Sequence, residues 1–213
     1  MQALPILSTP TIATLSQRRT STLLQPSWKR YFFWALLALF TVSFSQPIAA
    51  TTEPCFPLLA DGGLEDGREW QAKNSDGFPL LSRQLVHSGA QGAYLGGRNN
   101  VADRLSTTLH LPATGQTITL RFWWQLQSQE SATTGGDQLS VLAANKQGLP
   151  LQSLVELRGR DVAHEWQSMS IDLTHFAGQN IQLQFLASTD AEQITDFFID
   201  DVEIVACGTA NQK

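Results

Sequence analysis

The chain has 213 residues, of which 14 are Lys or Arg and 19 are Asp or Glu, so its formal net charge is −5. This length suits one domain with a sizeable core. The excess of acidic groups argues against nucleic acid or an anionic membrane surface as a partner, because both repel a negatively charged protein.

The first 50 residues indicate a signal peptide rather than a part of the fold. They contain four basic residues and no acidic one, and Lys29-Arg30 runs directly into the apolar segment YFFWALLALFTVSFS. Small Ala49 and Ala50 follow at the expected cleavage site. The apolar segment is shorter than the roughly 20 residues of a permanent membrane span; an uncleaved amino-terminal anchor is the alternative. We expect a secreted or cell-surface protein that meets a membrane only through an uncleaved segment.

Cys55 and Cys207 are the two cysteines of the chain, and they flank the predicted strands at its two ends. In an exported protein, two cysteines predict one disulfide; two free thiols are the alternative. A bridge would make the first and last strands neighbours. Closing so long a loop would stabilise the fold by about 4–5 kcal/mol in the chain-entropy account.

From Leu105 onward, apolar and polar residues alternate with a period of two, which is typical of strands with one buried face. We expect short early strands around Leu64, at 81–86 and at 93–95, and seven further strands at 105–111, 118–126, 139–143, 155–157, 169–173, 181–185 and 197–207. One helical turn is expected within 172–178. Short strands separated by turns predict a single all-β domain over residues 51–207, a sandwich or a barrel, with a disordered tail at 208–213.

The segment RFWWQ places two tryptophans on opposite faces of one predicted strand. Trp124 belongs to the core row, whereas Trp123 faces outward between an arginine and a glutamine. An exposed indole with polar neighbours suits a sugar, because the ring stacks on the apolar C–H face while the neighbours bond hydroxyls. Alternatively, a loop such as 128–136 covers Trp123 and makes it part of a second small core. The predicted ligand-binding residues are Trp123, Arg121, Gln125, Gln182 and Gln184.

Motifs of enzyme chemistry are missing from the sequence. The four histidines are far apart, at none of the spacings that suit zinc. The chain has no Gly-x-Ser-x-Gly elbow, no phosphate-binding loop and no His-Glu-x-x-His. We therefore expect no catalytic residues and a binding function.

Six stretches of the sequence together resemble a known family. They are LLADGGLEDGREW, GAYLGGRNNVADRL, LPATGQTITLRFWWQL, GDQLSVLAANKQGLPL, EWQSMSIDLTHFAGQNIQLQF and FFIDDVEIVAC. These are similar to the MAM-like and carbohydrate-binding-module-like domains of bacterial exported proteins, which are often attached to secreted peptidases or glycosidases. The resemblance covers residues 57–207, although the further cysteines of true MAM domains are missing. It implies a two-sheet antiparallel jelly-roll β-sandwich of the concanavalin-like or galactose-binding-like kind.

The same resemblance implies a structural calcium ion. Domains of this type hold calcium with an amino-terminal (N/D)GG(F/L)E motif and a carboxy-terminal IDDV motif. Here these match 61–65 and 199–202. Strict alternation places Asp200 on the buried face with Phe198, Val202 and Ile204, where an isolated carboxylate is costly. The implied metal ligands are Asp61, Glu65 and Asp200; alternatively, Asp200 accepts backbone N–H groups or pairs with an arginine, without an ion.

The sequence thus predicts an exported non-catalytic binding domain, stabilised by calcium and one disulfide, whose partner is carbohydrate. A protein-interaction or adhesion domain of MAM type, with a cell-surface protein as partner, is the main alternative. An accessory domain of a secreted peptidase is a further one.

Overall fold

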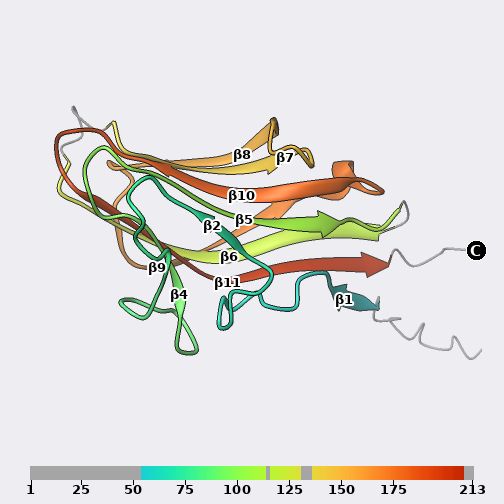
Figure 1. Ribbon diagram of the computed structural model, residues 1–213. Coiled ribbons are helices and arrows are strands. Elements are labelled where there is room, and N and C mark those ends of the chain that lie inside the picture. The colour runs from blue at the N-terminus through green and yellow to red at the C-terminus, as the bar shows by residue number, and fades with distance from the viewer. Residues whose placement is uncertain (1–53, 114–115, 131–135, 209–213) are drawn as a thin grey trace, which may run out of the picture. The chain divides into compact units, whose positions relative to one another are not determined.

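The computed structural model describes residues 54–113, 116–130 and 136–208 (Figure 1). The predicted signal peptide and residues 209–213 of the predicted tail lie outside these ranges, as does part of the loop after residue 128. Within the described ranges, we find no helix with the length and apolar character that crossing a membrane requires.

Eleven strands form two antiparallel sheets that face each other (Figure 1). The six-stranded sheet has the order β3-β4-β11-β6-β9, and β1 also pairs with β11; the five-stranded sheet has the order β2-β5-β10-β7-β8. The two sheets confirm the predicted sandwich. The strands are β1 (Cys55–Pro57), β2 (Gln71–Lys73), β3 (Leu81–Ser82), β4 (Gly92–Gly96), β5 (Ala102–His110), β6 (Gln116–Ser128), β7 (Gln138–Ala144), β8 (Pro150–Arg158), β9 (Ala163–Asp172), β10 (Asn180–Ser188) and β11 (Thr195–Gly208).

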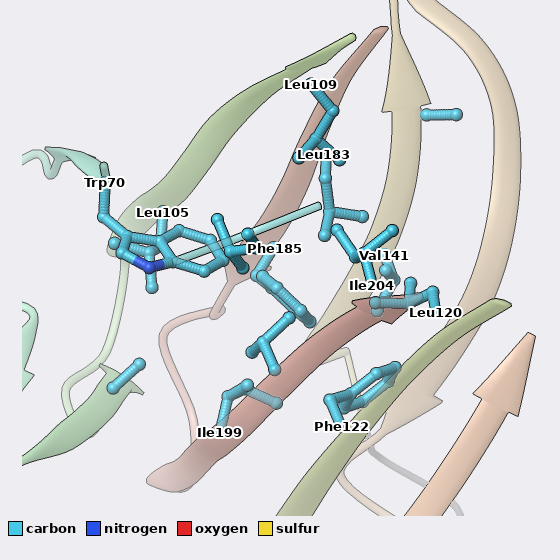
Figure 2. Packing of buried hydrophobic residues seen from close by; sticks show 14 of the residues in the cluster. Trp70, Leu105, Leu109, Leu120, Phe122, Val141, Leu183, Phe185, Ile199 and Ile204 are labelled. Carbon is cyan, nitrogen blue, oxygen red and sulfur yellow. The ribbon is translucent and has the colours of Figure 1, made fainter. Parts of the chain in front are cut away.

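The core lies between the sheets and is built from alternate residues of the long strands (Figure 2). Phe122 of β6 meets Phe185 of β10 edge to face, with ring centroids 5.3 Å apart, and Trp70 packs on Phe185 from the other side at 6.1 Å. Each large side chain buried here stabilises the fold by about 1.5–3 kcal/mol relative to an exposed one. The burial of these alternate side chains therefore holds the two sheets together.

The first half of the domain departs from the predicted strands. Leu64 is buried, but it lies in a turn with a φ of 60°, so the strand predicted around it is wrong. The strand predicted at 81–86 is only the two-residue β3. The helical turn predicted within 172–178 is confirmed as a short 3-10 helix at Thr174–Phe176.

The disulfide between Cys55 and Cys207 is confirmed. The two cysteines are direct partners in the antiparallel pairing of β1 with β11. The two ends of the domain are therefore joined by both a covalent bond and strand pairing.

A β-bulge in β11 changes which residues face the core. The register of β11 against β6 shifts between Asp200 and Glu203, and Asp201 has a φ of 47°. The extra residue reverses the alternation, so the core row of β11 is Phe197, Ile199, Val202, Ile204 and Ala206. Our prediction that Asp200 shares the core face with Val202 is wrong, because strict alternation ignores the bulge. Asp200 lies on the outer face, where residues before β4 cover it.

Candidate functional site

A cavity of about 610 Å³ lies on the six-stranded sheet, over β9, β6 and β11. Its walls combine aromatic and aliphatic surface with hydroxyl, carboxylate and guanidinium groups. They are formed by Leu59, Gly62, Gly63, Arg121, Phe122, Trp123, Ser168, Met169, Ser170, Asp201, Val202 and Glu203.

The polar residues of this cavity are cross-strand partners. Trp123 of β6 pairs with Ser168 of β9, and Arg121 pairs with Ser170 on one side and with Glu203 of β11 on the other. Residues opposite each other on neighbouring strands point to the same face. Two parallel rows of side chains thus cross the three strands, and the pairing register fixes their spacing.

The segment before Gly63 forms the side of the cavity next to β11. The N–H of Val202 donates a hydrogen bond to the carbonyl oxygen of Gly62 at 2.8 Å, at the bulge. A Cβ atom on Gly62 would collide with the carbonyl oxygen of Val202. Glycine at this position therefore allows the backbone to approach β11 and close the cavity on that side.

Trp123 is partly buried, and one face of its indole is covered by His87. The two rings are stacked with centroids 4.0 Å apart and an interplanar angle of 15°, and Trp166 packs edge-on against His87 at 5.5 Å. The cover comes from the segment before β4, and the rest of Trp123 lines the cavity. One face of Trp123 is therefore covered, but by His87 and not by the loop 128–136 considered above, and the side chain also lines the cavity.

The two aspartates of the IDDV motif hold this cover in place. Asp200 is fully buried, and its Oδ2 accepts the N–H groups of His87 at 2.7 Å and Ser88 at 3.2 Å. Asp201 Oδ2 lies 2.5 Å from His87 Nδ1, and its Oδ1 accepts the hydroxyl of Ser88 at 2.7 Å. Burial raises the pKa of Asp200, whereas the N–H donors lower it. Asp200 therefore accepts backbone N–H groups, as one of the two environments considered for it predicts.

The other two predicted calcium ligands are also held by backbone donors. Asp61 accepts the N–H of Glu65 at 2.9 Å and that of Gly67 at 2.7 Å, and Glu65 accepts the N–H of Ala90 at 3.0 Å. Among the described residues, these two carboxylates do not form a three-residue acidic group with Asp200. The calcium site that the resemblance implies at these three residues therefore stays a prediction.

Arg121 is exposed and forms a loose ion pair with Glu203, with 3.6 Å between Nη1 and Oε2. Exposed pairs of this kind contribute only about 0–1 kcal/mol to stability. Both side chains can therefore turn toward a bound molecule at little cost. Ser168 and Ser170 are exposed on β9. The sequence analysis did not predict these serines as ligand-binding residues. The alternation in QSMSID shows that they share one face of a strand, but it does not show that this strand pairs with the strand of Trp123.

The predicted glutamines do not join Trp123. Gln125 is buried and donates its side-chain N–H to the carbonyl oxygen of His164 at 2.6 Å. Gln182 and Gln184 belong to β10, which lies in the other sheet. Gln184 is only 2% exposed and donates to the carbonyl oxygen of Gly148. The alternation assigned these residues to outer faces correctly, but it could not tell which sheet each strand joins.

Gln182 instead lines a smaller cavity of about 230 Å³ on the five-stranded sheet. The walls of this second cavity are mainly polar and include Lys73, Arg104 and Lys146. It has no aromatic side chain in its wall. Of these two cavities, the one beside Trp123 therefore offers a ring on which a flat apolar surface could stack.

Glu130, Asp137 and Asp190 form an acidic group that the sequence analysis did not predict. One carboxylate oxygen from each lies within 4.8 Å of the others. Glu130 and Asp137 belong to the connection between β6 and β7, and Asp190 comes from the distant connection before β11. Nothing in the sequence indicates that these two loops meet.

Comparison with known proteins gives a family and a fold. A family model for the MAM domain, meprin/A5/mu, matches residues 61–208. The structure of TmCBM61 in complex with β-1,4-galactotriose is similar, with 18% identity over 70% of this chain and 97% of that chain and a TM-score of 0.52. The K3 cleaved adhesin domain of Lys-gingipain from Porphyromonas gingivalis matches with 18% identity, 71% and 99% coverage and a TM-score of 0.50. No curated protein sequence matches the chain.

Proposed function

We propose that this chain, which belongs to the MAM domain family, is an exported binding domain without catalytic activity, and that it holds carbohydrate in the cavity beside Trp123. The observation that carries this proposal is the cavity itself. It places the Trp123 ring, two hydroxyls, a guanidinium and two carboxylates around about 610 Å³. This volume lies within the range of sites that bind small molecules, roughly 300–1,000 Å³.

The recognition chemistry follows from the two rows of side chains. An apolar C–H face of a sugar ring would pack on the free part of the Trp123 indole. Hydroxyl groups of the sugar would bond to Ser168 and Ser170, and the Arg121–Glu203 pair would supply one donor and one acceptor group. Strand pairing fixes the backbone positions of these residues, so binding has to order only exposed side chains such as Arg121 and Glu203, at about 0.5–1.5 kcal/mol each.

Two further observations support the proposal. The disulfide between Cys55 and Cys207 is of a kind that persists in oxidising compartments, which agrees with export. The fold is shared with TmCBM61, a protein solved with a bound galactotriose. The proposal takes from that protein only the class of ligand.

The test is a binding screen of the intact chain against oligosaccharides and polysaccharides, followed by titration of each hit. We expect Trp123→Ala to weaken binding about tenfold or more, which corresponds to a loss of about 1.4 kcal/mol. Gln182→Ala is the control, because it alters the outer face of the other sheet. Loss with Gln182→Ala and not with Trp123→Ala would move the site to the five-stranded sheet and overturn the assignment.

A second candidate function is protein adhesion. Leu149 and Leu151 are 63% and 50% exposed; Leu149 immediately precedes β8, the edge strand of the five-stranded sheet, and Leu151 is its second residue. An exposed apolar edge strand can pair with a strand of another protein. A folded protein that binds no glycan in the screen would favour this function, and Leu149→Lys would then be the variant to examine in a search for protein partners.

A further inference from the structure

Glu130, Asp137 and Asp190 lie where two connections cross between the sheets. Glu130 follows the end of β6 by two residues, and Asp137 immediately precedes β7. Asp190 follows the end of β10 by two residues, on the way to β11. β6 and β11 belong to one sheet, whereas β7 and β10 belong to the other. The acidic group is therefore built from two connections that each join both layers.

The carboxylates of this group lack the donors that would satisfy them. Asp137 is fully buried; its Oδ1 accepts the N–H of Asp190 at 2.7 Å, whereas its Oδ2 is buried without a hydrogen bond of normal geometry. The Thr195 hydroxyl is the one side-chain donor that lowers the pKa of this carboxyl, and burial outweighs it. Glu130 Oε2 is likewise buried without a partner, while Oε1 accepts the N–H of Gly136 at 3.1 Å. A buried carboxylate oxygen without a partner costs on the order of 1–3 kcal/mol or more. A nearby positive charge would stabilise two such oxygens by offsetting the cost of burying them.

No basic side chain in the described ranges supplies that charge. The ion pairs found there join Arg68 to Asp66, His87 to Asp201, Arg98 to Asp76, Arg121 to Glu203 and Arg158 to Glu156. None of them includes a member of the acidic group. Burial, followed by the neighbouring Asp137 carboxylate, raises the pKa of Glu130, and burial raises the pKa of Asp137 as well.

Two glycines make room for the carboxylates. A Cβ atom on Gly159 would collide with Glu130 Oε2, and a Cβ atom on Gly136 would collide with Asp190 Oδ2. Gly159 is also bonded through its N–H to the carbonyl oxygen of Asp137 at 2.9 Å. The backbone is thus shaped closely around the oxygen atoms of the group.

We propose that Glu130, Asp137 and Asp190 bind a Ca²⁺ ion that ties the β6–β7 connection to the β10–β11 connection. Carboxylate oxygens suit hard divalent cations. Ca²⁺ accepts six to eight oxygens in flexible geometry, including carbonyl groups and water, whereas Mg²⁺ demands a near-ideal octahedron. A ligand set drawn from two loops fits the more tolerant ion. This site is distinct from the set Asp61, Glu65 and Asp200, and from the cavity beside Trp123.

The test is calorimetric titration of the intact chain with Ca²⁺ after treatment with EDTA, together with thermal unfolding in Ca²⁺ and in EDTA. We expect one ion to bind per chain and Ca²⁺ to raise Tm. Glu130→Gln and Asp190→Asn should each weaken Ca²⁺ binding about tenfold or more, since even outer-shell changes at metal sites cost about 10–100-fold. Both variants keep the shape of the side chain, so each can be checked for folding in EDTA.

Two matched controls make the result decisive. Glu192→Gln removes an exposed charge from the same loop as Asp190 and should leave the affinity within about threefold, a difference of under 1 kcal/mol. Asp200→Asn alters the other acidic region and should also leave the affinity unchanged. The proposal is overturned by the absence of Ca²⁺ binding, by binding that survives Glu130→Gln and Asp190→Asn, or by binding that only Asp200→Asn removes.

Discussion

Asp200 and Asp137 are both fully buried, yet their carboxylates have very different partners. Asp200 accepts N–H groups from His87, Ser88 and Asp201, so its charge is used to fix one loop over the sheet. Asp137 accepts one backbone N–H, its other oxygen is buried with only the Thr195 hydroxyl as a neighbouring side-chain donor, and two more carboxylates lie beside it. The comparison teaches that the donors around a buried carboxylate, rather than its burial or an acidic motif, distinguish a structural anchor from a cation site.

The largest loss of stability is expected from replacing Asp200, which anchors the 87–88 segment. Asp200→Ala leaves two part-buried N–H groups, those of His87 and Ser88, without their acceptor, and hydrogen bonds to a charged group contribute about 1.5–3 kcal/mol each. We expect the free energy of unfolding to fall by about 3 kcal/mol or more in urea denaturation, equally in Ca²⁺ and in EDTA. Asp200→Asn keeps one acceptor oxygen and should cost less. A loss that appears only in Ca²⁺ would mean that Asp200 holds an ion after all.

The stacking of His87 on Trp123 should contribute less to the stability of the fold than Asp200 does. His87→Ala removes the stack on Trp123 and the contact with Asp201, and such an aromatic pair contributes about 0.5–1.5 kcal/mol. We expect Tm to fall by about 2–4 °C, the shift that 1 kcal/mol gives in a domain of this size. His164→Ala, at an exposed position on the same face, is the control. Equal effects from both substitutions would show that the stack adds nothing.

At the acidic group, the effect of Glu130→Gln on the free energy of unfolding is expected to change sign between EDTA and Ca²⁺. In EDTA, Glu130→Gln removes a like charge beside Asp137, so the free energy of unfolding should stay the same or rise by up to about 1 kcal/mol. In Ca²⁺ the same substitution should destabilise the protein relative to the wild type, because a ligand is lost. Urea denaturation under both conditions measures the difference. Destabilisation of the same size in EDTA and in Ca²⁺ would show that Glu130 has a structural role like that of Asp200 and is not a cation ligand.

The smallest effect is a pH dependence at Asp103. Its Oδ2 accepts the N–H of Gly96, its Oδ1 is buried without a partner, and burial raises its pKa above the usual 3.8. A raised pKa in the folded state means that this residue's contribution is most favourable below pH 3.8 and is lost as pH rises through the folded pKa. Asp103→Asn should therefore become more stable relative to the wild type over that range, as urea denaturation at a series of pH values can measure. A stability difference independent of pH would refute this.

The sequence predicted the parts of the fold that depend on local pattern. Alternation in the long strands identified the β-sandwich, and the outward position of Trp123 beside Arg121 follows from the same rule. Cys55 and Cys207 were predicted to pair because two cysteines in an exported chain have one simple arrangement. These predictions needed no knowledge of how distant segments meet.

The errors all involve long-range pairing or local irregularity. The bulge at Asp201 reverses the alternation of β11, and nothing in IDDV reveals its position. Gln182 and Gln184 were grouped with Trp123 although β10 and β6 lie in different sheets. The group of Glu130 and Asp190 was missed because its members are 60 positions apart and meet only when the connections between the sheets fold together. Such features depend on topology, which the period of a single segment does not contain.

The most direct test of the proposed function is a crystal structure of the intact chain with the oligosaccharide that binds best in the screen. We predict that a sugar ring packs against Trp123 and that its hydroxyls bond to Ser168, Ser170 or the Arg121–Glu203 pair. A sugar bound on the five-stranded sheet beside Gln182, with the cavity at Trp123 unchanged, would contradict the account.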